Sequence, residues 1–435
     1  MKIVREVLLT ISAALIALSI PSATPGWCAV APGDEITPRN ADKVADLVSP
    51  GNLILVKQGM RMKIVAPGRL DWPPPYKAAT EKYSPQVSLT ADGELRNYVA
   101  GQPFPLLDSN DPQLATKVMW NFSFSPLYTD DVDVRDVEIA SFSAGTHAAD
   151  PIAHFGIGHV ALYNNVGRVE VAPMPTDPEA ASGIRYRFAA YPFLEPAEMR
   201  GFGFVRYRES DPHVEDNSWF YNPLSRRVRR IGYDMLSDAL GAVSGGGTAA
   251  NNLDPDSYYG FAAKIEDNTY KLIGEKAMLA CVHAEHSPAT PCPFDGNRTI
   301  CPEDWEMRHL FVIEANAKNN SYFFGVAIPK RILYIDSEAW CITASDQYDR
   351  SGQLWKTIAS FFAYRDRPAP DARVAIYPFK RIFQVAMVDQ NVQNGFSSVV
   401  YTPARASEER DCWYINMGIV GKGFFEPSSM QHAGH

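Results

Sequence analysis

The regular alternation of apolar and polar positions begins near residue 184 and continues through most of the remaining chain. Short runs rich in aromatic and β-branched residues recur about every ten residues, with turn-forming residues between them. A period of two is typical of strands that bury one face. The pattern predicts an antiparallel meander, so the expected fold class is mainly β with a few helices. The runs are Ile184–Phe188, Gly203–Arg208, Ser218–Tyr221, Val228–Tyr233, Asn268–Ile273, His309–Glu314, Tyr322–Ala327, Arg331–Asp336 and Ala339–Thr343.

One segment before this meander has helical spacing instead. Asp111 is a suitable N-cap and Pro112 suits the first helical position. Apolar residues then recur on one helical face, which predicts a helix near 112–120. Gly245–Gly247 would end a second, shorter helix over 233–243.

The first residues have the layout of an export signal. Lys2 and Arg5 precede an uncharged apolar run from Val7 to Ile20, which Pro21 closes. This run is too short for a stable membrane anchor, which needs about twenty residues. We therefore expect cleavage of residues 1–31 and release into the periplasm of a Gram-negative cell. No later stretch suggests a transmembrane segment in the mature chain.

No linker divides the mature chain into clear domains. The pattern predicts an N-terminal part over 32–180, the antiparallel meander over 181–426 and a loose tail over 427–435. The formal charge is −9, from 41 Lys and Arg against 50 Asp and Glu. Without residues 1–31 the counts become 39 and 49, and the charge becomes −10. An acidic chain argues against nucleic acid as a partner.

Motifs for nucleotide or acyl chemistry are missing from the sequence. Gly245–Gly247 lacks the Gly-Lys-Ser/Thr of a phosphate-binding loop, and no Gly-x-Ser-x-Gly elbow occurs. We expect no cofactor and assign no catalytic residue. Acids occur in pairs at Asp130 and Asp131, Asp254 and Asp256, and Asp346 and Asp349, but adjacency alone does not predict acid–base chemistry. We interpret 346–352 as a turn with capping acids.

Five cysteines follow the predicted signal. In an oxidising compartment some should pair, and Cys292 with Cys301 is the most local candidate for a disulfide. The stretch Cys281-Val-His283-Ala-Glu-His286 offers metal-type ligands, but without the order typical of catalytic zinc. A structural metal is therefore the alternative to a disulfide with ordinary loop histidines, and we assign no metal site.

Four arginines crowd one predicted strand: Arg226, Arg227, Arg229 and Arg230. Burying two guanidinium groups on one strand face is costly. One interpretation is a site for an anionic head group or a protein partner. The other is a solvated edge strand, which charge protects from pairing with other chains.

Aromatic residues are abundant on the predicted strands. Trp219 and Tyr221 are two apart and should share one sheet face. A strongly curved sheet with such a face could enclose an apolar cavity, although ordinary core packing explains any single aromatic residue. The candidates for ligand binding are Trp219, Tyr221, Tyr258, Phe261, Tyr334 and Trp340.

Several strings, in this order, resemble the bacterial family called domain of unknown function 1329. They are Ala100–Pro105, Asp111–Asn121, Trp219–Arg230, Tyr270–Gly274, Lys330–Trp340 and Asp346–Trp355.

The resemblance spans roughly Gly33 to Asn416 and implies kinship with the LolA/LolB-like carriers of lipoprotein sorting. It also implies a large, curved, incompletely closed antiparallel β-barrel with helices as a plug, shaped around a hydrophobic ligand. Family members are secreted and often accompany hydrophobe exporters or outer-membrane proteins. The segment 281–301 departs from the usual family sequence.

These observations favour a periplasmic protein that binds or carries a lipid, a sterol-like molecule or a hydrocarbon, accessory to an envelope exporter. One alternative is an enzyme acting on a hydrophobic or envelope substrate, which two convergent titratable groups in a cavity would favour. The other is a scaffold that docks an envelope transporter or outer-membrane protein through Arg226–Arg230, which a filled core would favour.

Overall fold

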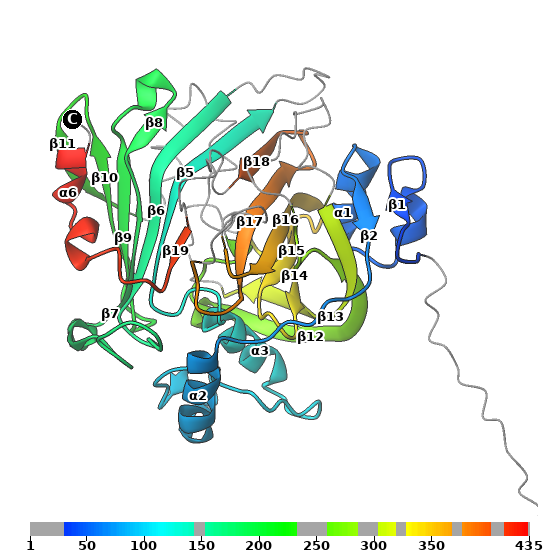
Figure 1. Ribbon diagram of the computed structural model, residues 1–435, viewed down its shortest axis with the longest axis horizontal. Helices are drawn as coiled ribbons and strands as arrows, with labels where there is room; N and C mark the ends of the chain where they lie inside the picture. Colours follow the sequence, from blue (N-terminus) through cyan, green and yellow to red (C-terminus); the bar gives the residue numbers. More distant parts are fainter. Residues whose placement is uncertain are drawn as a thin grey trace, which may run out of the picture.

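The computed structural model describes residues 30–142, 153–232, 259–285, 303–318, 328–367, 376–401 and 413–433 (Figure 1). Several predicted features lie outside these residues: the export signal up to residue 29, the helix over 233–243, Tyr258, His286, and the Cys292–Cys301 pair.

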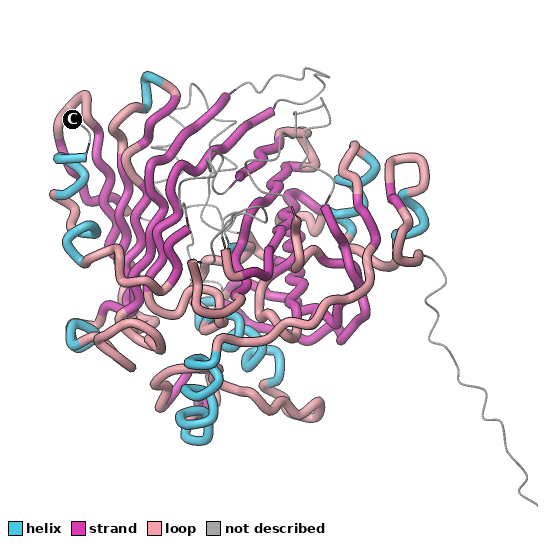
Figure 2. Tube along the Cα trace, viewed as in Figure 1, coloured by secondary structure: helices cyan, strands magenta, loops and turns pink. Residues whose placement is uncertain are grey.

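One large sheet dominates the described residues (Figures 1 and 2). Its strands run antiparallel in the order β11-β10-β9-β7-β6-β5-β18-β17-β16-β15-β14-β13-β12. Figure 1 shows that the sheet is curved. Within the described residues β11 and β12 each pair on one side only, so the sheet does not close into a barrel. The prediction of a mainly β, incompletely closed antiparallel sheet with a few helices is confirmed.

The sheet draws strands from both sides of residue 180. The main strands are β5 (Asp131–Phe142), β6 (Ala153–Asn164), β7 (Ile184–Ala190), β9 (Gly203–Glu209), β10 (Asn217–Asn222), β11 (Arg227–Ile231), β12 (Asn268–Ala280), β13 (Glu303–Ala317), β14 (Lys330–Asp336), β15 (Ile342–Tyr348), β16 (Leu354–Arg365), β17 (Arg381–Asn391) and β18 (Ser397–Tyr401).

Shorter strands extend this frame. β8 pairs with β6, β19 pairs with β5, and β2 runs parallel to the start of β13 with β1 beside it. β3 and β4 form a separate hairpin. Their bounds are β1 (Glu35–Ile36), β2 (Met62–Ile64), β3 (Ser88–Leu89), β4 (Leu95–Arg96), β8 (Phe193–Glu195) and β19 (Trp413–Ile415).

The α-helices are α1 (Pro50–Lys57), α2 (Pro74–Tyr83), α3 (Leu114–Ser123) and α6 (Ser429–Ala433), which lies in the predicted tail. Single 3₁₀ turns are η1 (Ala41–Val44), η2 (Ser84–Gln86), η3 (Pro178–Ser182), η4 (Ala197–Met199), η6 (Ile265–Asp267) and η7 (Lys422–Phe425). Among the described residues no helix is both long and apolar enough to cross a membrane.

Helix α3 starts slightly later than its sequence predicts. Gln113, not Asp111, is its N-cap. The Asp111 carboxylate instead accepts a hydrogen bond from the Gln113 backbone N–H at 2.7 Å and pairs with Lys117. Asp111 therefore forms the turn before the helix. The apolar face of α3 packs on β13 and β14, through a cluster that includes Val118, Met119, Phe311 and Leu333.

A C-terminal segment, residues 413–433, covers one face of the other half of the sheet. Its β19 pairs with β5 within the sheet, whereas η7 and α6 form the cover, and Figure 1 shows them in red beside β9, β10 and β11. Phe425 and Met430 pack there against Tyr163, Tyr191 and Tyr221. The two halves of the curved sheet are thus built differently: α3 packs on β12–β14, and the chain end packs on β6–β10.

Candidate functional site

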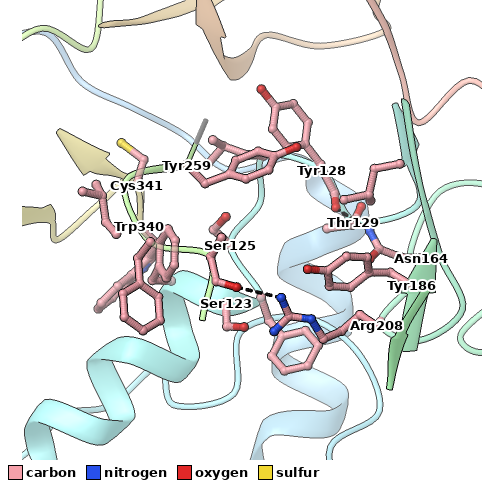
Figure 3. Close-up of a pocket in the computed structure, with 18 of the residues that line it drawn as sticks. Ser123, Ser125, Tyr128, Thr129, Asn164, Tyr186, Arg208, Tyr259, Trp340 and Cys341 are labelled. Carbon is pink, nitrogen blue, oxygen red and sulfur yellow. Dashed lines mark hydrogen bonds between the residues drawn. The ribbon is translucent and has the colours of Figure 1, made fainter. Parts of the chain in front are cut away.

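A pocket with a volume of about 150 Å³ lies between the two halves of the sheet. Figure 3 shows Trp340 and Cys341 on one side, Asn164, Tyr186 and Arg208 on the other, and Tyr128 and Tyr259 above. The end of α3 and the segment 259–265 complete the wall. Much of this lining is aromatic, and the pocket is partly open to solvent.

The C-terminal end of α3 forms the floor. The helix ends at Ser123, and the next residues bring the Phe124 ring and the Ser125 side chain to the pocket. The Tyr98 ring lies 3.8 Å from the Phe124 ring, centroid to centroid, and Tyr76 donates a hydrogen bond to the Phe124 carbonyl at 2.7 Å. These contacts hold the loop after the helix in one position.

The first side wall comes from β6, β7 and β9. Tyr186 and Arg208 are direct neighbours across β7 and β9. Arg208 forms an ion pair with Asp216 at 2.8 Å and donates to the Ala262 carbonyl at 2.7 Å. Arg208 therefore connects the sheet to the segment that lies over the pocket.

Arg185 reaches the same wall because the β7–β9 ladder is irregular there. Ile184 pairs with Glu209 and Tyr186 with Arg208, which leaves Arg185 as an extra residue. A bulge of this kind redirects a side chain. Consequently Arg185 and Tyr186, although adjacent in sequence, both line the pocket.

The opposite wall depends on the turn between β14 and β15. Trp340 has a left-handed backbone (φ 53°), which is uncommon for a bulky residue. The Asp336 carboxylate accepts hydrogen bonds from the Glu338 and Ala339 backbone N–H groups at 2.9 and 2.7 Å, and it also binds Arg308. The turn is thereby fixed, and it holds the Trp340 ring 5.8 Å from the Phe311 ring in a stacked arrangement.

Two further irregularities border this wall. An extra Val385 separates the pairs Phe361–Ala386 and Phe362–Gln384, and the β14–β15 register shifts just after Ile342, at Thr343. Phe362, Gln384 and Ile342 all line the pocket. Bulges are frequent beside functional sites because they bend strands and redirect side chains.

The electrostatic environment of the pocket is positive. Arg185 and Arg208 line it, and no Asp, Glu or His is among the described residues that do so. Burial lowers the pKa of Arg185 and raises the pKa of Tyr128 to about 12. Burial alone would also raise the pKa of Tyr186, but Arg208 and Arg206 together outweigh it and lower that pKa. The lowered pKa of Tyr186 therefore reflects an excess of positive charge around its hydroxyl.

The predicted ligand-binding aromatics occupy three places. Phe261 and Trp340 line the pocket. Trp219 and Tyr221 share a sheet face, but it is the one that the C-terminal segment covers. Tyr334 packs in another cluster with Met278 and Leu310. The structure thus brings together two of the five candidates that it describes, and ligand binding by any of the six stays a prediction.

Sequence reasoning missed Phe124, Arg185 and Tyr186. Phe124 comes four residues after the predicted end of the helix and directly after its observed end at Ser123. The sequence signal for Phe124 was therefore its place just past a helix end. Arg185 carries no comparable signal, because its position depends on a bulge formed with a strand some twenty residues later.

The Cys/His segment is only partly described. Cys281 and Cys341 are buried free thiols, and burial raises the pKa of each well above its usual value. His283 binds the Glu306 carboxylate through Nδ1 at 2.9 Å. No group of His, Cys, Asp or Glu among the described residues is arranged to hold a metal ion.

The arginine cluster lies on the edge strand β11 and the turn before it. Arg226, Arg227, Arg229 and Arg230 are all exposed. Their assignment to an anionic head group or a partner stays a prediction.

The paired acids have separate structural surroundings. Asp346 is buried and accepts hydrogen bonds from the Gly51 backbone N–H at 3.2 Å and from Thr357 at 2.8 Å. It therefore lies against the first turn of α1. Asp349 accepts hydrogen bonds from the backbone N–H groups of Ser351 and Gln353, within the β15–β16 turn. Asp130 and Asp131 are buried at the start of β5, and Asp254 and Asp256 lie outside the described residues.

The fold and the pocket together define a class of protein: an open, curved antiparallel sheet that holds an aromatic-lined pocket in its bend. The chain belongs to the DUF1329 family, described as proteins of unknown function, whose sequence model matches residues 35–431. The resemblance seen in the sequence is thereby confirmed. No curated protein matches the chain.

Similar solved structures come from three bacteria. A Vibrio parahaemolyticus domain, provisionally described as an outer membrane lipoprotein-sorting protein, is 16% identical, with 69% of this chain and 92% of that chain covered and a TM-score of 0.42. A DUF1329 protein from Desulfovibrio piger is 13% identical, with the same coverage and a TM-score of 0.41. A LolA superfamily protein from Nitrosomonas europaea is 13% identical, with 68% and 90% covered and a TM-score of 0.34.

Proposed function

We propose that this protein binds and carries a hydrophobic small molecule, such as a lipid, a sterol-like molecule or a hydrocarbon, in the periplasm. The observation that carries this proposal is the aromatic-lined pocket between the two halves of the sheet. An apolar molecule gains about 0.8 kcal/mol for each methylene removed from water. A pocket that shields such a molecule would let it cross an aqueous compartment.

The size of the pocket narrows the cargo. A cavity of about 150 Å³ lined by apolar side chains is known to accept benzene. The pocket described here has the same volume, about 150 Å³, and is partly open. It therefore fits a compact ring, or one end of a longer molecule whose remainder extends through the opening.

Binding is favoured over catalysis and over a pure docking role. General acid–base catalysis needs convergent titratable groups of suitable pKa, and the described lining contains no carboxylate and no histidine. A scaffold without cargo would be expected to have a filled core at this place. The predicted export signal and the exposed Arg226–Arg230 cluster support an accessory role beside an envelope transporter as part of the same proposal.

The test is native mass spectrometry of the mature protein purified from periplasm, with organic extraction of any bound molecule. We expect a reproducible apolar molecule, and an intact mass that matches cleavage near Ala29 or Ala31. In parallel, the extracted protein is titrated with the fluorescent apolar probe N-phenyl-1-naphthylamine, and we expect saturable uptake. A protein that is empty when purified and takes up no probe would overturn the proposal.

A further inference from the structure

Arg185 is a cation inside the protein without a matching anion. Its Nη2 donates to the carbonyl and the hydroxyl of Ser123, at 3.2 and 2.8 Å, and its guanidinium lies 4.2 Å above the Phe124 ring centroid. No carboxylate among the described residues lies within 4.0 Å of it. The side chain nevertheless keeps accessible surface, because it lines the pocket. Enclosing a charge without a counter-ion costs free energy. Binding of an anion from solution beside Arg185 would therefore be favourable.

A second arginine stands behind the same wall. Arg206 is only 3% exposed, and its Nε and Nη1 have no hydrogen-bond partner among the residues that the structure describes. Its Nη2 approaches the hydroxyl of the pocket-lining Tyr186 at 3.4 Å. Arg206 and Arg208 alternate on β9 and therefore point to the same sheet face as Tyr186. Arg206 therefore adds a second positive charge next to the Tyr186 hydroxyl.

The acids near this wall do not balance both arginines. Asp216 is engaged by Arg208 at 2.8 Å and by Lys264 at 3.6 Å. Glu266 acts on Arg185 only from beyond ion-pair distance. Burial raises the pKa of Asp267, and the nearby charges of Lys264 and Arg208 only partly oppose this. The positive charge around Tyr186 thus exceeds what these three carboxylates neutralise by direct contact.

We propose that the cargo is an amphiphile whose anionic oxygen head group, a carboxylate or a phosphate, binds at Arg185 beside Tyr186, with its apolar part against Phe261 and Trp340. This inference rests on the proposed function, since it assigns a charge to the molecule that the pocket holds. The bulge at Arg185 is then the feature that brings a second cation, beside Arg208, to this wall of the pocket.

The test compares three ligands of equal chain length: octanoate, octyl phosphate and 1-octanol. Each displaces N-phenyl-1-naphthylamine from the protein at pH 7.5, where octanoate is ionised. Hydrogen bonds to charged groups are strong enough to change affinity about tenfold to a hundredfold. We expect at least one anion to bind about tenfold more tightly than 1-octanol, and the tighter anion identifies the head group.

Two variants assign the effect to Arg185. Arg185→Gln should remove the preference for the anion and leave the affinity for 1-octanol within about twofold, whereas Arg185→Lys should restore part of the preference. Arg39→Gln, at an exposed arginine, is the matched control. Thermal unfolding of each variant checks that the fold persists.

The outcomes separate the two proposals. If all three ligands displace the probe equally well, or if Arg185→Gln keeps the full preference, the anionic head group is excluded while the hydrophobic carrier stands. If the probe itself does not bind the wild-type protein, the carrier proposal fails first.

Discussion

Two aromatic regions of this protein border the strands β6, β7 and β9 from opposite faces, and they have opposite fates. The covered aromatic face, formed by Tyr163, Tyr191, Tyr207, Trp219 and Tyr221, is sealed by the C-terminal segment. There the Phe424 ring stacks on Tyr191 at 4.5 Å, and Phe425 is fully buried. The aromatic residues of the pocket face, by contrast, leave about 150 Å³ unfilled.

The comparison shows that aromatic content does not identify a binding site. Tyr163 belongs to the covered face, whereas its neighbour Leu162 lines the pocket, and Tyr207 and Arg208 divide in the same way. The difference is made by which distant segment packs on which face. Only the chain end at 413–433 turns the first region into core.

The largest expected effect comes from opening the covered face. Phe425→Ala removes a fully buried ring, and such a change costs about 3–5 kcal/mol. We expect this loss in the free energy of unfolding measured with urea, with uptake of N-phenyl-1-naphthylamine unchanged. Leu224→Ala, at a side chain that is 85% exposed, is the control and should change stability by less than about 0.5 kcal/mol. A variant that lost probe uptake while staying folded would show that the two faces are not independent.

A smaller effect should come from the anchor of that segment. The Gly418 backbone N–H lies 3.1 Å from both carboxylate oxygens of Asp131, and burial raises the pKa of Asp131 to about 6. In the unfolded chain this pKa is about 3.9. The folded protein therefore binds more protons between these values, and stability from this group, complete below pH 4, is lost as the pH rises through 6. Two pKa units correspond to about 3 kcal/mol.

The measurement is the free energy of unfolding at several pH values for the wild type and Asp131→Asn. The wild type should lose up to about 3 kcal/mol relative to the variant between pH 4 and pH 6.5. Asp92→Asn, at an exposed carboxyl, serves as control and should follow the wild type. Parallel curves for wild type and Asp131→Asn would refute the assignment.

On the pocket side, filling the space should affect binding more than stability. Ser125 borders the pocket, and its hydroxyl has no hydrogen bond to a described residue. Ser125→Phe places a ring in the cavity. We expect it to weaken uptake of N-phenyl-1-naphthylamine at least about tenfold, equivalent to about 1.4 kcal/mol, while the unfolding midpoint moves little. Ser88→Phe, on the exposed hairpin β3–β4, should bind like the wild type, and equal binding by both variants would place the probe elsewhere.

Elements that depend on local sequence pattern could largely be predicted from the sequence. Alternation predicted β7, β9, β10, β11, β12, β13 and β14, and it correctly placed Trp219 and Tyr221 on one face, because the period of two is a property of the strand itself. It was wrong at Ala339–Thr343, where the chain makes the β14–β15 turn and enters β15 only at Ile342. The predicted run Tyr322–Ala327 lies outside the described residues. Apolar spacing found helix α3 within a few residues. The resemblance to DUF1329 added the open, curved sheet.

The pocket could not be predicted in the same way, because irregular positions build it. Arg185 enters the wall through a bulge, and Trp340 is held by a left-handed turn. Both depend on partners distant in sequence, and neither shows in a periodic pattern. Likewise, nothing in the stretch 217–222 reveals that residues 413–433 will cover its Trp219 and Tyr221.

The smallest expected effect on stability is at the edge where the covered face ends. Helix α6 lies against β11. Arg227, Arg229 and Arg230 are exposed on this strand, which within the described part of the chain pairs on one side only. If these charges protect the edge, Arg227→Thr/Arg229→Thr should unfold within about 1 kcal/mol of the wild type. The double variant should also self-associate at high protein concentration, because uncharged edge strands pair with one another.

Sedimentation velocity over a range of concentrations measures this self-association, with Lys271→Thr on the other edge strand, β12, for comparison. A double variant that stays monomeric but loses salt-sensitive binding to vesicles containing anionic lipid would instead favour a head-group role for these arginines.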